Sequence, residues 1–292
     1  MSSFYYLAAI FFISLCGSAQ VYHLEDRFKD HLEMNDLKGK VKSVRMTQYM
    51  LKHPSNDTVT FTKERQYYID TFYNENGNIT VSKSYRNNNS MSREELYSYD
   101  ANQRLVLNIG RYPDVKGSEL ETTFTYDAQG NLIKEEGVMP LYHKTISTKT
   151  MTYNEHNQMI EMVIYYDMDG VKDIRKYRYD DLNRKIEAVS GDAKGNNTTT
   201  ITYYPQSNLV AQRVSTFYNG DTIVSDYMYN DHQNIINYKS VTTGTYSSTE
   251  DKRVTYKYDA QGSWIMSSSF YKSVDGAQYD MYFVQEREIV YY

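Results

Sequence analysis

Beyond residue 36, hydrophobic and polar positions tend to alternate with a period of two, which is the pattern of a β-strand and not of a helix. Aromatic residues stand two positions apart at the end of several segments, as in Tyr97/Tyr99 and Phe124/Tyr126. Clusters of Asn, Asp and Gly separate the segments, and these residues favour tight turns. The pattern therefore predicts a series of short strands joined by hairpin turns.

A block led by tyrosine recurs eight times, at successive spacings of 26, 27, 27, 26, 24, 26 and 29 residues. Such regular intervals indicate a repeat architecture. The residue after the tyrosine is Asp or Asn in seven copies, which nucleates a turn, and the residue seven places on is always β-branched, which favours a strand. The fourth residue after the tyrosine is usually Gly, Asn or Gln, as a positive φ requires, and in one copy this position is Ser207. The leading tyrosines are Tyr73, Tyr99, Tyr126, Tyr153, Tyr179, Tyr203, Tyr229 and Tyr258.

A second, more variable turn signal, such as Asn219-Gly220, lies between successive copies. Each copy thus supplies two strands, and a degenerate hairpin over residues 40–70 precedes the array, so we expect about 16–18 antiparallel strands. Laid flat, such a sheet would be about 85 Å wide, and strands twist. We therefore expect an all-β meander coiled into a solenoid-like or half-open, barrel-like sheet. The charges of Glu286, Arg287 and Glu288 would discourage pairing at its last edge.

The N-terminal residues predict an export signal. Phe4–Leu15 is almost wholly apolar but too short to span a membrane, and the small residues Gly17 and Ala19 precede a cleavage position before Gln20. We expect a signal peptide over residues 1–19 and a secreted, periplasmic or outer-membrane-associated protein. A lipoprotein anchored through Cys16 is the alternative. No later segment has the length of a transmembrane helix.

Residues 20–36 form the expected cap segment ahead of a single repeat domain over residues 37–292. Leu24, Phe28 and Leu32 stand four residues apart, which predicts a short amphipathic helix covering a sheet edge. Cys16 is the one cysteine, so disulfides, Cys-ligated metals and thiol nucleophiles are not expected in the mature chain.

Composition changes the picture in two ways. The chain has 32 tyrosines and 10 phenylalanines but one tryptophan, so tyrosine rings must supply much of the core. The formal net charge is −5, from 32 Lys and Arg against 37 Asp and Glu. A protein that binds along the phosphate backbone of a nucleic acid needs a cluster of basic residues on one face. The negative net charge therefore argues against a nucleic-acid partner.

The block Tyr-Asp-x-x-Gly-Asn-Leu, complete at Tyr126–Leu132, resembles the YD repeat of the Rhs family. The strand-like ends Leu37–Val44 and Glu286–Tyr292 also resemble those of small secreted or envelope proteins of Gram-negative bacteria. The resemblance covers residues 37–292 and implies a β-hairpin repeat fold in an envelope setting. Large Rhs proteins wind such hairpins into a shell around a toxin, and we do not expect this sequence to enclose one.

The residues that could carry out catalysis do not indicate an enzyme. No nucleophile-elbow, zinc-protease, phosphate-loop or dinucleotide motif is present. His156 and His232 share a turn position three copies apart, too far to share a metal. Adjacent Glu94 and Glu95 should point to opposite faces of a strand, as should Glu135 and Glu136. The acidic turn residues are expected to be solvated instead of binding calcium: Asp100, Asp127, Asp180 and Asp259. We expect no catalytic, metal-binding or cofactor-binding residue.

The aromatic residues are the remaining candidate site. Tyrosines aligned on one face can form a platform for sugar rings or an extended peptide, or they can form the core. The candidate ligand-binding residues are Trp264, Tyr99, Tyr126, Tyr153, Tyr179, Tyr229 and Tyr258. The sequence predicts a non-enzymatic binding or structural module with a glycan or envelope-protein ligand. An enzyme acting on envelope glycans and an accessory fragment of an Rhs-like export or immunity system are the alternatives.

Overall fold

The computed structural model describes residues 32, 35–52, 62–167, 170–192, 195–272 and 279–292. These residues form 18 β-strands, with a 3-10 turn at Pro140–Tyr142. The strands are β1 (Val41–Lys52), β2 (Thr62–Tyr73), β3 (Ile79–Arg86), β4 (Met91–Tyr99), β5 (Leu105–Arg111), β6 (Leu120–Tyr126), β7 (Leu132–Met139), β8 (Lys144–Tyr153), β9 (Met159–Tyr166), β10 (Val171–Tyr179), β11 (Lys185–Asp192), β12 (Gly195–Tyr203), β13 (Val210–Thr216), β14 (Thr222–Tyr229), β15 (Ile235–Thr243), β16 (Ser248–Tyr258), β17 (Trp264–Lys272) and β18 (Tyr279–Tyr291).

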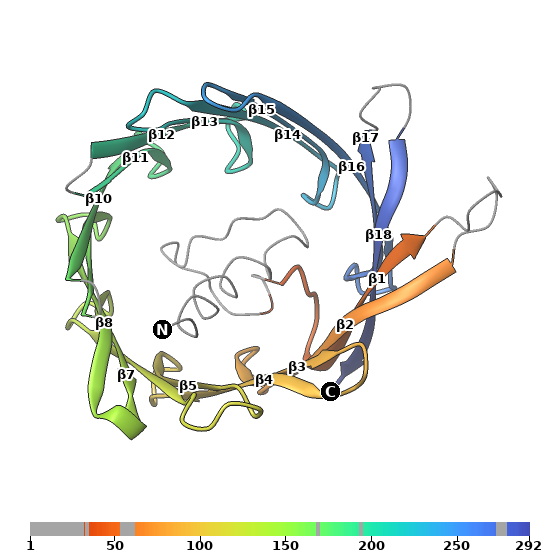
Figure 1. The fold of residues 1–292 in the computed structure, drawn as a ribbon, viewed down its shortest axis with the longest axis horizontal. Helices are drawn as coiled ribbons and strands as arrows, with labels where there is room; N and C mark the ends of the chain where they lie inside the picture. Colours follow the sequence, from red (N-terminus) through yellow and green to blue (C-terminus); the bar gives the residue numbers. More distant parts are fainter. Residues whose placement is uncertain (1–31, 33–34, 53–61, 168–169, 193–194, 273–278) are drawn as a thin grey trace, which may run out of the picture.

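All 18 strands belong to one antiparallel sheet that closes into a barrel (Figure 1). Each strand pairs with its neighbours in sequence, and β1 also pairs with β18 from Val41↔Tyr291 to Met50↔Phe283. The expected all-β antiparallel meander is confirmed. The expected solenoid-like or half-open sheet is wrong, because a closed ring leaves no free edge.

The charged residues of β18 do not protect an edge. Glu286 lies opposite Thr47 of β1, and its carboxylate forms an ion pair with Lys63 of β2. Glu288 lies opposite Arg45. Both carboxylates therefore lie beside cations of neighbouring strands. The charges that suggested a free sheet edge instead occur where the sheet closes.

Seven of the eight leading tyrosines are followed by a turn that an Asp or Asn side chain closes. In the first copy, Asn74 Oδ1 accepts the backbone N–H groups of Asn76 and Asn78, both at 3.0 Å. The backbone N–H of Asn74 also donates to the carbonyl of Asn78 at 2.9 Å. Gly77 adopts a φ of 81°, where a side chain would be strained. The turn chemistry read from the repeat is thus confirmed.

The copy led by Tyr203 departs from the others. Its turn is one residue longer, because Tyr204 N–H donates to the carbonyl of Leu209 at 3.0 Å. The positive φ of 53° falls at Gln206, so its assignment to Ser207 was wrong.

The two ends of the domain build a ninth turn of the same kind. In a regular copy, Tyr73 lies opposite Ile79 and a register shift follows. At the seam, Tyr291 lies opposite Val41 with the same kind of shift, and Tyr292 N–H donates to the carbonyl of Lys40 at 3.0 Å. The seam therefore repeats the hydrogen bonding of the covalent turns, which explains why nine hairpins close.

The segment 35–40 identifies the inner wall of the ring. It runs inside the ring to the start of β1 (Figure 1), and Leu37 packs in one cluster with Val44, Tyr97 and Ile289. Because side chains alternate along a strand, the face bearing Val44, Tyr97 and Ile289 is the inner wall, and the opposite face is the outer wall.

The outer wall carries charge at the middle of several strands. Arg45 pairs with Asp70 at 2.7 Å, and Glu94 pairs with Arg111 at 2.6 Å and Lys83 at 3.3 Å. Cross-strand registers place these residues side by side on β1 to β5. Over β1 to β5, the outer wall therefore carries paired charges.

Two apolar clusters pack on the inner wall. One centres on Leu37, Val41 and Val44 near the seam, and the other on Met162 and Tyr177 of β9 and β10. The expected signal peptide, Cys16 and most of the expected cap helix lie outside the described residues. No helix among the described residues is long and apolar enough to cross a membrane.

Candidate functional site

Most of the predicted platform tyrosines brace the hairpins. Tyr99, Tyr126 and Tyr153 donate their hydroxyls to backbone carbonyls of the preceding hairpin, at 2.6, 2.8 and 2.8 Å. Tyr179 and Tyr203 do the same at 2.8 Å, and Tyr256 does so at 3.0 Å. We call these six residues the tyrosine ladder. Since each hydroxyl satisfies a carbonyl where two hairpins meet, the ladder links the copies.

The other predicted ligand-binding residues are also engaged. Trp264 is 3% exposed, with the Arg287 guanidinium carbon 3.3 Å from its ring centroid. The Tyr258 hydroxyl donates to Asn234 Oδ1 at 2.7 Å. The Tyr229 ring packs edge-on against Tyr204, with centroids 6.3 Å apart, and burial raises the pKa of Tyr229 to about 12. The structure therefore gives each of these side chains a contact within the protein, and ligand binding by them stays a prediction.

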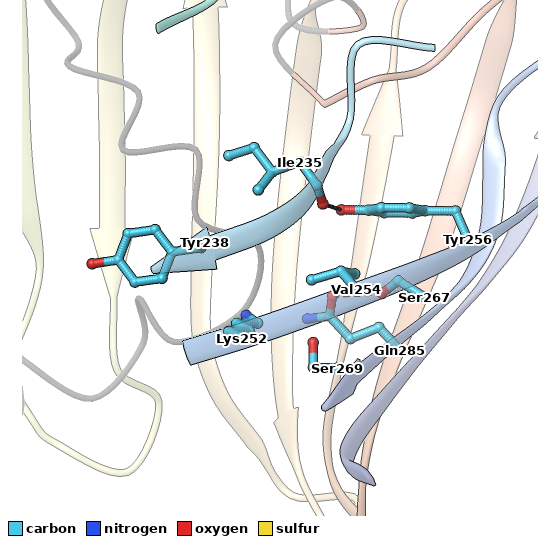
Figure 2. Close-up of a pocket in the computed structure, with 8 residues that line it drawn as sticks. All are labelled: Ile235, Tyr238, Lys252, Val254, Tyr256, Ser267, Ser269 and Gln285. Carbon is cyan, nitrogen blue, oxygen red and sulfur yellow. Dashed lines mark hydrogen bonds between the residues drawn. The ribbon is translucent and has the colours of Figure 1, made fainter. Parts of the chain in front are cut away.

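A shallow recess in the inner wall of β15 to β18 gathers a different set of residues (Figure 2). Its cavity volume is about 20 Å³, room for roughly one water molecule. Tyr238 and Tyr256 stand at its two ends, with Lys252 and Gln285 between them. The lining residues are Ile235, Tyr238, Lys252, Val254, Tyr256, Ser267, Ser269 and Gln285.

Cross-strand pairing positions these side chains. Tyr238 lies opposite Lys252, and Ser267 lies opposite both Tyr256 and Gln285. Since directly paired residues share one face of a sheet, the recess draws its groups from four adjacent strands. Lys252 is 6% exposed, and its ammonium lies 5.5 Å from the ring centroid of Tyr271.

A buried hydrogen-bonded chain holds the floor of the recess and crosses the seam. Ser267 Oγ donates to Gln285 Oε1 at 3.3 Å, and Gln285 Nε2 donates to Gln48 Oε1 at 3.1 Å. Tyr67 donates its hydroxyl to the same oxygen of Gln48 at 2.9 Å. The chain fixes the amide orientation, so Gln285 presents its polar groups in a defined geometry.

Tyr256 belongs both to the ladder and to the recess. Its hydroxyl donates to the carbonyl of Ile235, and burial raises the pKa of the phenol above its ordinary value. The phenol therefore stays neutral at physiological pH. Its ring packs edge-on against Trp264, with centroids 6.1 Å apart. The recess thus has one wall that the scaffold itself keeps in place.

Charged side chains on the inner wall of β4 to β10 form ion pairs with one another. We call this part of the wall the paired arc. Lys149 bonds Glu135 at 2.6 Å, Arg93 bonds Glu95 at 2.8 Å, and Arg175 bonds Asp173 at 3.0 Å. Each carboxylate here accepts from a cation of the same wall. These ion pairs neutralise the charges of the side chains within the wall itself.

The remaining candidate acidic and histidine residues lie in turns or on opposite faces of the sheet. Glu94 bonds Arg111 on the outer wall while Glu95 bonds Arg93 on the inner wall, so adjacent carboxylates do point apart as predicted. His232 stacks on Tyr258 with centroids 3.9 Å apart. Asp100 and Asp180 accept backbone N–H groups of their own turns. Within the described ranges, no group of three or more His, Cys, Asp or Glu residues is placed to hold a metal ion.

The repeat did not reveal the recess, because its residues lie in strand interiors where the copies differ. Tyr238, Lys252 and Gln285 follow no shared spacing. Gln48 and Gln285 are 237 residues apart and meet only because the ring closes. Cross-strand register was the missing information.

No protein-family model and no curated protein matches the chain. Solved structures do match. The crystal structure of TcdB2-TccC3-TEV has a TM-score of 0.36 and 16% identity, over 78% of this chain and 15% of that chain. The crystal structure of a porin-like protein from Bacteroides uniformis ATCC 8492 has a TM-score of 0.43 and 11% identity, over 87% of this chain and 99% of that chain.

A structure of the Tc holotoxin pore from Photorhabdus luminescens matches with a TM-score of 0.28 and 11% identity, over 75% of this chain and 16% of that chain. This chain thus spans about 15% of the length of the TcdB2-TccC3-TEV chain. All three likenesses are too low in TM-score to carry an argument about function. Membership of the Rhs repeat family stays a prediction.

Proposed function

We propose that the chain is a non-enzymatic, secreted or envelope-located binding module whose ligand is a glycan that lies along the inner wall, over the recess of β15 to β18. The observation that supports this most is the set of side chains lining the recess. Tyrosine rings offer apolar faces to sugar rings, and Ser267, Ser269 and Gln285 offer hydroxyl and amide groups. Mostly neutral groups that both donate and accept suit a polyhydroxylated ligand.

The size of the ring is compatible with a chain-like ligand. Eighteen strands spaced ~4.8 Å apart give a backbone diameter of at least roughly 28 Å, and tilt enlarges it. Side chains of the wall alone fill barrels of about eight strands, not eighteen. A glycan approaching along the ring axis meets the recess from the inside.

The outer wall supports an aqueous location. Charged side chains facing lipid at the middle of a membrane barrel cost about 2–4 kcal/mol each for Arg or Lys. Arg45 and Lys83 occupy such outward positions together with Asp70 and Glu94. These residues favour water around the ring, in agreement with a secreted or periplasmic protein.

Titration calorimetry with cellohexaose, chitohexaose and hexagalacturonate tests the proposal. We expect at least one of the three to bind the full chain, and Tyr238→Ala to weaken that binding about tenfold. Tyr165→Ala is the matched control, because Tyr165 is 44% exposed on the outer wall and should leave the affinity unchanged. Absence of binding by all three probes, or an equal loss in the control, contradicts the proposal.

A further inference from the structure

We infer that one rim of the ring docks on a lipid surface. The turns after the leading tyrosines lie at one end of the ring, which we call the tyrosine rim. The alternate turns lie at the opposite end, which we call the distal rim. Several large hydrophobic side chains are exposed on the described turns of the distal rim: Val115, Leu141, Tyr142, Tyr218 and Tyr246. This inference does not depend on the glycan recess.

The tyrosine rim is different. Its turns are built on Asp and Asn, and its exposed tyrosines are tied to the protein by their hydroxyls. Tyr204 donates its hydroxyl to the carbonyl of Tyr227, and Tyr292 donates to the carbonyl of Tyr73, both at 2.7 Å. Leu182 is the exposed leucine of this rim, and it lies in a turn that Asp180 closes.

The tyrosines of the distal rim keep their hydroxyls available. Within the described residues, the hydroxyls of Tyr142, Tyr218 and Tyr246 make no hydrogen bond. Tyrosine is enriched at membrane–water interfaces, because its ring enters the apolar boundary while its hydroxyl stays among the headgroups. The distal rim therefore presents the type of side chain that is stable at a lipid surface.

The exposed side chains occupy two places on the rim. Val115, Leu141 and Tyr142 lie on the turns β5–β6 and β7–β8, and we call them the first apolar tip. Tyr218 and Tyr246 lie on the turns β13–β14 and β15–β16 and form the second apolar tip. β6 and β14 stand eight strands apart one way around the 18-stranded ring and ten the other way. The two tips therefore lie on opposite sides of the ring (Figure 1).

The turns of the first apolar tip pack against each other. A Cβ atom added to Gly117 would lie 2.2 Å from Leu141 Cδ2, so the backbone of one turn contacts the side chain of the next. His143 adopts a φ of 48° and donates its backbone N–H to the carbonyl of Pro140 at 3.1 Å, which closes the 3-10 turn. Leu141 and Tyr142 are thus held in a fixed turn.

The turns of the second apolar tip are linked by hydrogen bonds. The backbone N–H of Tyr218 donates to Asn197 Oδ1 at 3.0 Å. Asp221 Oδ1 accepts the backbone N–H of Thr245 at 2.7 Å, which joins the turn of Tyr218 to the turn of Tyr246. Because both tips are fixed before binding, docking orders few additional backbone groups.

The separation of the tips favours a broad partner. The ring has a backbone diameter of at least roughly 28 Å, so one peptide in a single groove does not contact both tips. A stable interface between proteins buries about 1,200–2,000 Å² around a packed core, and two separated tips do not form such a core. A lipid surface is laterally continuous, and each apolar side chain can enter it independently. The geometry therefore favours lipid over a second copy of the chain.

Carboxylates beside the first apolar tip do not oppose this docking. Asp114 pairs with Arg86 at 2.7 Å, and Asp167 lies 4.0 Å from Lys144. Since these charges are balanced locally, apolar insertion supplies the affinity. A neutral lipid is therefore sufficient, and salt should have little effect.

Sedimentation with phosphatidylcholine vesicles tests the inference on residues 20–292, the expected mature chain. We expect binding that is equal in 0.05 and 0.5 M NaCl. Replacing Leu141→Ser and Tyr142→Ser together should weaken it about tenfold or more, because two apolar side chains no longer leave water. Leu182→Ser is the matched control, since Leu182 is 62% exposed and Leu141 57%, but they lie on opposite rims. Absence of binding, loss of binding in high salt, or an equal loss in the control overturns the inference.

Fluorescence locates the docked rim. In Tyr142→Trp, emission should shift to the blue when vesicles are added, and in Leu182→Trp it should not; the buried Trp264 is common to both proteins. Sedimentation without a blue shift in Tyr142→Trp would place the lipid on another surface and overturn the inference. So would a dimer in light scattering without lipid that the Leu141→Ser, Tyr142→Ser protein no longer forms. Failure of every glycan probe overturns the proposed function and leaves this inference standing.

Discussion

The two sides of the inner wall use the same hairpins for different purposes. In the paired arc, Lys149 and Glu135 neutralise each other at 2.6 Å. On β13 to β18, which we call the recess arc, Arg213 faces uncharged neighbours and Lys252 lies between tyrosines. Turns closed by Asp or Asn occur in both arcs. The tyrosine ladder has four members in the paired arc and Tyr256 in the recess arc, so the difference in charge arises within the strands. The repeat builds the ring, and non-repeated strand positions give each arc its chemistry.

Removing a cation from the paired arc should have the largest effect on folding. Lys149→Gln leaves Glu135, which is 9% exposed, without its ion-pair partner. We expect the free energy of unfolding to fall by about 1–3 kcal/mol, the range for a buried polar group deprived of its partner. Urea denaturation measures it, and glycan affinity should not change. A variant of unchanged stability but weakened binding would reverse the assignment of the two arcs.

Removing one hydroxyl of the tyrosine ladder should lower the free energy of unfolding by the same amount in either arc. Tyr126→Phe and Tyr256→Phe each remove one hydroxyl that donates to a carbonyl, at 2.8 and 3.0 Å. We expect each to lower the free energy of unfolding by about 1 kcal/mol. Tyr165→Phe is the control, because that side chain is exposed on the outer wall. Unequal losses at Tyr126 and Tyr256 would show that the arcs do not share one scaffold.

Acid should loosen the turns after Tyr99 and Tyr179 before the turn after Tyr229. The backbone N–H of Arg104 holds the pKa of Asp100 below its usual value, and the Arg184 side chain does the same for Asp180. A lowered folded-state pKa stabilises the protein above the unfolded value of about 3.9, and this contribution is lost as pH falls through the folded pKa. The turn after Tyr229 is closed by Asn230, which does not titrate.

Hydrogen exchange measured between pH 6 and pH 3, corrected for intrinsic rates, compares these turns. We expect protection to fall at the amides of residues 102 and 104 and of 182 and 184, by a small factor because both carboxylates are near solvent. The amides of His232 and Asn234 should keep their protection. Equal loss at all three turns would mean that turn carboxylates do not set the acid response.

Local structure was largely predictable from the sequence. Strand, turn and strand again follow from alternation and from the Asp or Asn after each tyrosine, because both depend on neighbouring residues. The failure at Ser207 has a local cause, one extra residue in the turn after Tyr203. Four ladder residues were predicted to bind a ligand, and this role stays a prediction: Tyr99, Tyr126, Tyr153 and Tyr179. In the structure their hydroxyls donate to backbone carbonyls.

Closure and the recess were not predictable, because both depend on residues far apart in the chain. From the sequence, Glu286 and Glu288 were expected to protect a free sheet edge. In the structure, β1 lies beside them. The contact between Gln48 and Gln285 exists only in the closed ring. No repeat spacing encodes which end pairs with which, and the Tyr292 to Lys40 hydrogen bond imitates a turn without a continuous chain.

The closed ring is the claim on which both arcs depend, and a seam cross-link tests it most directly. Thr47 and Glu286 lie opposite each other on β1 and β18. In a Cys16→Ser background, Thr47→Cys with Glu286→Cys should form a disulfide under mild oxidation, because paired residues of antiparallel strands have suitable Cα distances of about 4.5–5.5 Å. Mass spectrometry of the non-reduced peptides would show the link joining β1 to β18. Two free thiols in the folded, oxidised protein would contradict closure.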